Sequence, residues 1–191
     1  MRNLTYLIAT SYDGFISRPD GAIDDFSFDG EHVADLLAEY PETIPTHLRE
    51  HIPVADECRH FDAVLMGRAT YELGSKAGFT NPYQHMDQYV FSTTLEASPD
   101  EAVTLVPENP VGVVRELKAR DGLGIWLCGG PLLAAALIDE IDEIVLKVNP
   151  FLMGAGKPLF ARGFPKKDLA VVSRRDYDNG FALVKCKPVD P

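Results

Sequence analysis

The stretch AVLMGRATYEL, residues 63–73, decides the fold class of this chain. Its first four residues are an unbroken apolar run, which is typical of a strand that is buried on both faces. Gly67 allows the backbone to turn sharply, and the residues through about Leu73 are then predicted to form a helix. A buried strand that leads through a glycine directly into a helix is typical of α/β proteins with parallel strands.

The same arrangement occurs a second time further along the chain. Residues 125–128 (IWLC) predict another buried strand, Gly129 and Gly130 follow, and a helix is expected over residues 132–138. Other strands are predicted at residues 4–9, 89–92, 103–106 and 144–148, and other helices at residues 33–40, 46–51 and 111–118. A hairpin is predicted where residues 169–172 and 181–184 flank the turn sequence DNG. The expected fold is an α/β sheet, parallel in its middle, with an antiparallel C-terminal hairpin at one edge.

The length and charge of the chain limit the kinds of protein it can be. Its 191 residues fit a single domain, residues 1–191, and 29 acidic residues against 18 basic ones leave a net charge of −11. This charge argues against nucleic acid and anionic membranes as partners, since both require a positive surface. No run of ~18 apolar residues predicts a membrane span, and the N-terminus is predicted to be a strand and not a secretory leader. The three cysteines are far apart and predict no disulfide framework, which favours the cytoplasm.

Each strand–glycine–helix junction is a candidate phosphate site. A helix N-terminus exposes unpaired amides with partial positive charge, and glycine lets a ligand approach the backbone closely. Two such junctions in one parallel sheet could hold the two ends of a dinucleotide at the carboxyl edge of the strands. Neither junction matches the GxGxxG or the P-loop pattern, so those two nucleotide-binding motifs are excluded.

Arg68 is unusual because a cation in a first helical turn is disfavoured by roughly 0.3–1 kcal/mol. A bound anion would reverse that effect, whereas an ion pair with Glu72 would explain Arg68 without a ligand. The hydroxyls of residues 92–94 follow a predicted strand directly, and they could either bind a phosphate or cap a turn. The glycine pair could likewise be only a tight turn before Pro131.

One other pattern suggests a different chemistry. His47, Glu50 and His51 match the HxxEH arrangement of some zinc proteases. The predicted helix is little longer than one turn and lies between Pro45 and Pro53, which is too short to present a rigid metal site. No metal is therefore expected.

Four motifs resemble a known family, and they occur in its order. Residues 66–72 (MGRATYE) resemble the M-G-R-x-T-[WY]-E segment of dihydrofolate reductases. Residues 11–16 (SYDGFI) resemble the S-x-D-G-x-I start of the reductase domain of the riboflavin-biosynthesis enzyme, the RibD C-terminal family. Residues 125–132 are similar to the second nucleotide contact of both, and residues 149–160 to the late glycine loop of stand-alone members. Together the motifs span roughly the whole chain.

The resemblance implies a dihydrofolate reductase-like, three-layer α/β/α fold with a mixed, centrally parallel sheet and a C-terminal antiparallel hairpin. It also implies NADPH as cofactor and usually a homodimer. The cofactor-binding residues that it implies are Gly67, Arg68, Ala69 and Thr70 for the adenosine phosphate side and pyrophosphate; Ser92, Thr93 and Thr94 for the 2′-phosphate; Gly129, Gly130, Pro131 and Leu132 for the pyrophosphate and nicotinamide half; and the backbone of Ala9 and Ile16 for the carboxamide.

Two departures from the family leave the substrate open. Cys128 stands where riboflavin-type reductases carry a glutamate that contacts the pyrimidine, and residues 73–77 (LGSKA) replace their D-D-P-x-L-T-x-R stretch. The resemblance implies hydride transfer to a C=N or C=O carbon of a small pterin- or pyrimidine-like molecule. The alternative is a nucleotide-binding protein without catalysis on the same scaffold, since a fold does not determine a function.

Three aspartates are the expected catalytic residues. Asp13 lies in the turn after the first strand and is the first candidate for a polar group near the nicotinamide, although an Asp-Gly pair also simply forms turns. Asp24 or Asp25, in the long loop that follows, would donate the proton if burial raised its pKa.

Overall fold

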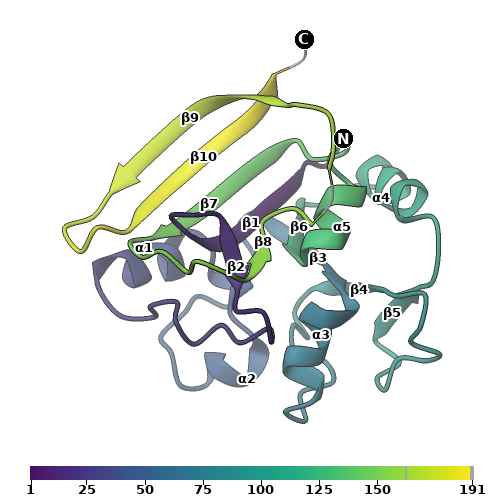
Figure 1. The fold of residues 1–191 in the computed structure, drawn as a ribbon. Coiled ribbons are helices and arrows are strands. Elements are labelled where there is room, and N and C mark those ends of the chain that lie inside the picture. The colour runs from purple at the N-terminus through teal and green to yellow at the C-terminus, as the bar shows by residue number, and fades with distance from the viewer. Residues whose placement is uncertain (162, 190–191) are drawn as a thin grey trace.

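A computed structural model describes residues 1–161 and 163–189 of the chain (Figure 1). The strands are β1 (Leu4–Ser11), β2 (Phe15–Ser17), β3 (Phe61–Gly67), β4 (Asp87–Phe91), β5 (Val103–Val106), β6 (Gly124–Gly129), β7 (Glu143–Asn149), β8 (Lys157–Pro158), β9 (Asp168–Asp176) and β10 (Ala182–Val189). The helices are α1 (Glu31–Glu39), the 3-10 helix η1 (Pro41–Thr43), α2 (Thr46–Arg49), α3 (Arg68–Ser75), α4 (Pro110–Ala119) and α5 (Pro131–Ala136). No helix in the described ranges is long and apolar enough to cross a membrane.

Eight of the described strands form one mixed sheet in the order β5-β4-β3-β6-β1-β7-β10-β9. The six strands from β5 to β7 are parallel, whereas β10 runs antiparallel to both β7 and β9. β1 occupies the middle, where Leu4 pairs with Ile125 of β6 and Ser11 with Asn149 of β7. The predicted parallel centre and antiparallel C-terminal hairpin are thus confirmed.

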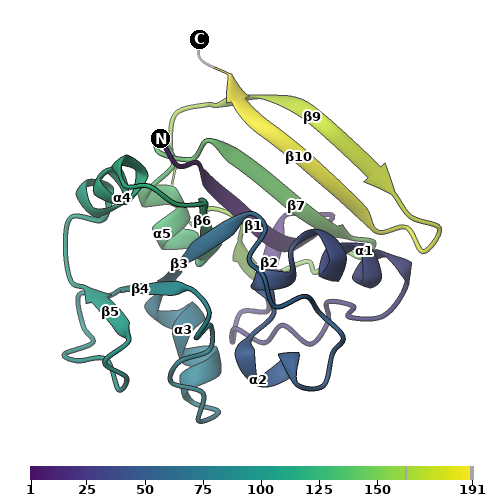
Figure 2. The same ribbon diagram turned by 180° about the vertical axis from the view of Figure 1, so that it is seen from behind.

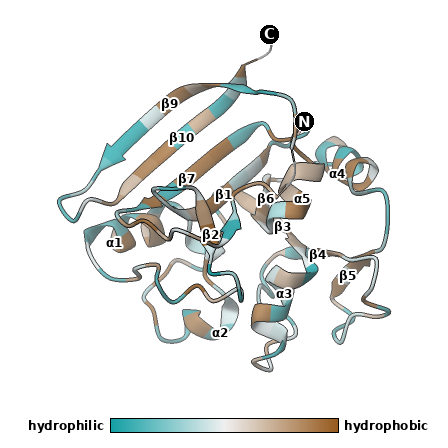
Figure 3. Cartoon of the chain, viewed as in Figure 1, coloured by the Kyte–Doolittle hydropathy of each residue, from teal (hydrophilic) through white to brown (hydrophobic). Residues whose placement is uncertain are grey.

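Helices cover both faces of the sheet, so the central strands are buried on both faces. Successive residues of β1 point to opposite faces, with Leu7 in one buried cluster and Tyr6 in the other. The Leu7 cluster includes Tyr40, just after α1, and Tyr71 of α3, and the Tyr6 cluster includes Leu133 of α5. α5 lies nearer the viewer in Figure 1 and α1 in Figure 2. β7 is brown over most of its length in Figure 3, as its apolar sequence requires.

A small second sheet was not predicted from the sequence. β2 pairs with β8 through Phe15 and Pro158, and the Leu159 amide donates to the Gly14 carbonyl at 2.9 Å. β1 also extends to Ser11, two residues beyond its predicted end. These contacts join the late glycine loop to the turn after β1, at the carboxyl edge of the large sheet.

Glu42, in η1, fixes the chain where it enters β3. The residue is completely buried, and its carboxylate accepts backbone N–H bonds from Arg59 at 3.3 Å, His60 at 2.7 Å and Phe61 at 2.9 Å. Three donors converge on one buried carboxylate, which satisfies amides that would otherwise lack partners. The start of β3, and hence the Gly67 junction at its other end, depends on this contact.

The edge of the large sheet that is formed by β9 is not covered by any other element of the described chain. Every residue of β9 is exposed, and its outer side has no strand neighbour. Leu169, Val171 and Val172 are among the exposed large apolar residues of the chain. An exposed edge strand of this length is a ready site for pairing with another chain.

Candidate functional site

The two strand–glycine–helix junctions lie against each other, because β3 and β6 are neighbours in the sheet. A β-carbon added to Gly67 would lie 3.3 Å from the Gly130 nitrogen, and one added to Gly130 would lie 3.3 Å from the Thr70 hydroxyl. Gly129 has a φ of +136°, and the Gly129–Gly130 peptide is cis. Only glycines let the two backbones approach this closely, so the two motifs form one site.

A cavity of about 890 Å³ opens beside these junctions. The predicted cofactor residues that line it are Gly67, Arg68, Ala69, Ser92, Thr93, Thr94, Gly130, Pro131 and Leu132. Thr70 contacts the glycine pair, while Ala9, Ile16 and Gly129 are not part of the lining. The volume lies in the range of roughly 300–1,000 Å³ that is usual for ligand and cofactor sites.

Another part of the lining had no counterpart in the predictions. It comprises residues 106–110, between β5 and α4, together with Lys157 and Pro158 of β8 and Ala161. Residues 106–110 and Lys157 lie along the wall of the cavity, and the Lys157 ammonium lies next to Gly21, in the loop after β2. Lys157 lies within the late glycine loop, so that motif was the only signal that could have identified it.

Arg68 makes the ion pair with Glu72 that was one of its two interpretations, and it also contacts Thr94. Its Nε donates to Glu72 at 2.5 Å, and its Nη1 donates to the Thr94 hydroxyl at 2.6 Å. Hydrogen bonds from Lys76 and Arg68 lower the pKa of Glu72, so this carboxylate stays ionised. The Arg68 side chain is 48% exposed at the cavity, which leaves it able to contact an anion there.

Ser92 caps a turn, as one of its two interpretations proposed. Its hydroxyl accepts the backbone N–H bonds of Thr94 at 3.2 Å and Leu95 at 2.9 Å. That turn holds Thr94 against Arg68, so Ser92 positions the wall of the cavity. α3 adds its own free amides, since Gly67 at its N-cap makes no side-chain cap hydrogen bond. The cavity therefore combines free amides, hydroxyls and the Arg68 cation, a donor set that fits a phosphate-bearing dinucleotide.

Asp13 anchors the late glycine loop. Its carboxylate accepts hydrogen bonds from the Ser11 hydroxyl at 2.6 Å and from the amides of Met153 at 3.0 Å and Gly154 at 2.7 Å. The bond from Ser11, with those from the two amides, lowers the pKa of Asp13 to about 2. Asp13 therefore remains ionised at neutral pH and anchors both the turn after β1 and the late glycine loop, while its place near the nicotinamide stays a prediction.

The expected burial of Asp24 and Asp25 is wrong. Both carboxylates pair with Arg18: Asp25 at 2.5 Å and Asp24 at 3.4 Å. The Asp24 side chain is 71% exposed, and the Arg18–Asp25 bonds are at the surface. The physical reason is local, because Arg18 lies only a few residues earlier in the same loop and supplies a counter-charge in water.

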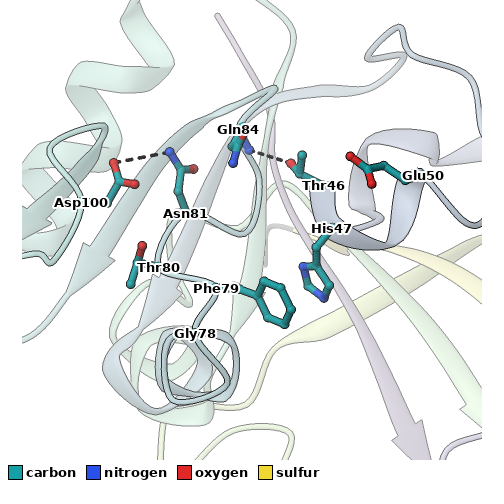
Figure 4. A pocket seen from close by; sticks show the side chains of 9 residues that line it. All are labelled: Thr46, His47, Glu50, Gly78, Phe79, Thr80, Asn81, Gln84 and Asp100. Atoms are coloured by element: carbon teal, nitrogen blue, oxygen red, sulfur yellow. Dashed lines mark hydrogen bonds between the residues drawn. The ribbon is translucent and has the colours of Figure 1, made fainter.

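A second, smaller cavity of about 350 Å³ lies at the HxxEH segment (Figure 4). There the His47 ring stacks on Phe79 with ring centroids 3.6 Å apart, while Thr46 accepts a hydrogen bond from the Gln84 amide. Across the described residues, no cluster of three or more His, Cys, Asp or Glu side chains could hold a metal ion. His47 thus packs as an aromatic side chain.

Comparison with known proteins agrees with this architecture. The model of the RibD C-terminal domain matches residues 2–183. YwjB, a protein of Bacillus subtilis (strain 168) described as uncharacterised, is 31% identical over 164 residues, which cover 83% of this chain and 83% of that protein.

Solved structures share the fold along the whole chain. A Shewanella sp. PV-4 protein provisionally assigned to riboflavin biosynthesis has a TM-score of 0.69 at 24% identity, with all of both chains covered. Dihydrofolate reductase from Enterococcus faecalis, solved with NADP(H) and RAB-propyl, has a TM-score of 0.65 at 12% identity and covers 98% of this chain and 97% of that one. The dihydrofolate reductase-like fold is therefore confirmed.

Proposed function

Because this chain belongs to the RibD C-terminal domain family, we propose that it is an NADPH-dependent reductase. It transfers a hydride to a C=N or C=O carbon of a small pterin- or pyrimidine-like substrate. The observation that carries the proposal is the 890 Å³ cavity at which both glycine junctions, Arg68 and the residues 92–94 turn meet. We propose the cytoplasm as its location, where Cys58, Cys128 and Cys186 remain free thiols.

Each part of the cavity has a role in this proposal. The amides at the start of α3 and the backbone of the glycine pair hold the pyrophosphate, and Arg68 with Thr94 holds the 2′-phosphate. When bound, NADPH supplies a hydride that is transferred to the substrate. The protein orients the two reactants and excludes water from between them.

Replacing Arg68 by alanine is expected to weaken NADPH binding about 10- to 100-fold, the usual cost of losing a charge-assisted hydrogen bond to a phosphate. NADH lacks the 2′-phosphate, so its affinity should change much less. Isothermal titration calorimetry with both cofactors measures the two effects.

Arg115→Ala is the matched control, because this exposed arginine of α4 pairs with Glu140, and neither residue lines the cavity. Equal losses for NADPH and NADH would contradict the 2′-phosphate role of Arg68. Tight NADPH binding without oxidation across a panel of pterins, aminopyrimidines and quinones would favour the non-catalytic nucleotide-binding alternative.

We also propose that two copies of the chain pair through β9 to form a homodimer. β9 offers unpaired backbone groups and three exposed apolar side chains, and a second copy would satisfy both. Val171, 63% exposed, lies near the middle of the strand.

Val171→Arg is expected to convert the dimer to monomers, because a buried charge without a partner costs several kcal/mol. Leu48→Arg, the same kind of change at an exposed leucine of α2, should leave the dimer intact. Sedimentation equilibrium distinguishes the two states, and a wild-type monomer or a dimeric Val171→Arg variant would refute this interface.

A further inference from the structure

Lys147 occupies a half-buried position that its charge does not suit. It lies on β7, opposite Ala9 of β1 and Leu183 of β10, and it is only partly exposed. Val145, two residues earlier, belongs to the buried cluster beneath α1, and residues two apart on a strand share a face. Lys147 therefore points to the α1 side of the sheet, near the carboxyl edge where β1 ends.

The Lys147 ammonium has no counter-charge in the described parts of the chain. Neither a hydrogen bond nor an ion pair to its Nζ occurs there, whereas Lys185, on the adjacent strand, pairs with Glu39. Burial lowers the pKa of Lys147, and the nearby Cys128 thiol opposes that shift only in its ionised form. Burial also raises the pKa of Cys128 to about 12, so the thiol beside Tyr83 stays protonated.

His32 of α1 brings a second unpartnered group to the same place. The residue is 1% exposed, and its ring stacks on Phe181. Its Nδ1 lies 3.0 Å from the side-chain nitrogen of Asn179. The Asn179 side-chain oxygen accepts the Phe181 N–H, and this contact fixes which end of the amide faces His32. Nδ1 is therefore the acceptor, and the proton is on Nε2, which is buried and makes no hydrogen bond of normal length and angle in the described chain.

His32 and Lys147 are electrostatic neighbours. Burial lowers the pKa of His32, while the Ser27 backbone and the Asp29 charge, both in the loop before α1, oppose that shift. The Lys147 charge adds a smaller lowering of the same pKa. His32 is thus neutral and presents an N–H donor beside the lysine.

Asn149, two residues after Lys147 on β7, adds an acceptor. It is 2% exposed, its amide nitrogen donates to the Lys147 carbonyl, and its Oδ1 has no partner among the described residues. A buried polar group without a partner costs about 1–3 kcal/mol, and such groups are rare in native proteins. A ligand that bonds to the His32 Nε2, the Asn149 Oδ1 and the Lys147 ammonium would explain why all three groups lie here without partners.

We propose that Lys147 contacts the acceptor substrate and donates the proton that completes its reduction, while His32 and Asn149 hold the same molecule by hydrogen bonds. The inference rests on the proposed function, since Ala9, paired with Lys147, is where the nicotinamide carboxamide is expected. The substrate is a heterocycle with a C=O or C=N heteroatom toward Lys147 and an N–H toward Asn149.

The chemistry balances without any further reactant. The carbon of the C=O or C=N bond would receive the hydride that NADPH supplies when bound, and the two π electrons would move to the heteroatom. The Lys147 ammonium transfers one proton to that heteroatom and becomes a neutral amine, which water then reprotonates. The products are the oxidised nicotinamide and an alcohol or amine. A lysine with a lowered pKa suits this role, whereas the ionised Asp13 does not.

The first test uses pyridoxal, a planar heterocyclic aldehyde, as the probe. Its carbonyl condenses with a neutral amine to an imine with loss of water, and borohydride traps the product for peptide mapping. Lys147 is expected to be modified at neutral pH several-fold faster than any surface lysine, in the chain without cofactor. Modification of surface lysines alone would overturn the proposal, because the carbonyl then does not reach Lys147.

The second test is kinetic, with a substrate from the pterin and aminopyrimidine panel. Lys147→Met is expected to lower kcat by about 10²- to 10⁴-fold, the usual contribution of a general acid. Lys147→Arg should not restore it, since a guanidinium keeps the charge but does not give up its proton. In the wild type kcat should fall as pH rises through the pKa of Lys147, and Lys147→Met should lack this fall.

Lys185→Met is the matched control and should retain activity, because Glu39 already neutralises that lysine. If Lys147→Met kept the wild-type kcat and pH profile, the role of Lys147 would be refuted. The proposed function would still stand, provided that the wild-type protein binds NADPH. Failure of the wild type to bind NADPH would instead refute the proposed function, and the pyridoxal experiment would still decide whether Lys147 meets a carbonyl ligand.

Discussion

Gly130→Val is expected to abolish cofactor binding, with a loss of at least about 100-fold, or roughly 2.7 kcal/mol. Gly130 has extended backbone angles that any residue can adopt, so the effect is steric and not conformational. Its first side-chain atom would already lie 3.3 Å from the Thr70 hydroxyl, and two methyl groups would add to this. Since Gly130 also lines the cavity, valine removes the space in which the pyrophosphate meets the backbone.

The measurement is a calorimetric titration with NADPH, accompanied by a thermal melt. Overpacking of this kind costs about 1–3 kcal/mol, so most of the protein should remain folded. Gly163→Val is the control, because a β-carbon there meets no atom within 4 Å. Unchanged NADPH affinity in Gly130→Val would mean that the cofactor does not approach this junction.

The second large effect concerns stability. Glu42→Ala should lower the free energy of unfolding by at least ~3 kcal/mol, because three backbone N–H donors lose a carboxylate acceptor and a hydrogen bond to such a group contributes about 1.5–3 kcal/mol. The donors are the amides of residues 59–61, and the carboxylate that they share is completely buried. For a domain of this size the melting temperature should fall by roughly 6–12 °C.

Differential scanning calorimetry and urea unfolding test this expectation. Glu57→Ala is the matched control, since Glu57 is exposed on the same connection and accepts none of these bonds. Equal melting temperatures for the two variants would show that water replaces Glu42 as the acceptor.

The parts of the fold that were predictable are those with a strong local pattern. The apolar runs that end at Gly67 and Gly129 are long enough to identify buried strands, and the DNG turn identifies the hairpin. The β2–β8 pair has no such pattern, because β8 contains two residues and one of them is Pro158. Its pairing is decided by the loops that meet there, and these are far apart in the sequence.

The same distinction holds for the site. The junction glycines and Arg68 lie in contiguous motifs, and the structure brings them together at one cavity. Lys147 lies in the strand sequence IVLKVN, where a single lysine resembles an ordinary exposed position of a half-buried strand. Its burial and its lack of a counter-charge follow from β10 and α1, which no local pattern places beside it.

The central place of β1 in the sheet also limits how early the chain can fold during synthesis. β1 is synthesised well before its neighbours β6 and β7, which begin at Gly124 and Glu143, so its edges stay unpaired until those strands have left the ribosome. Pairings between such distant segments close large loops and slow folding. During synthesis the Leu4–Ser11 segment is therefore an apolar strand without partners, and it is the part of the nascent chain on which a chaperone would act.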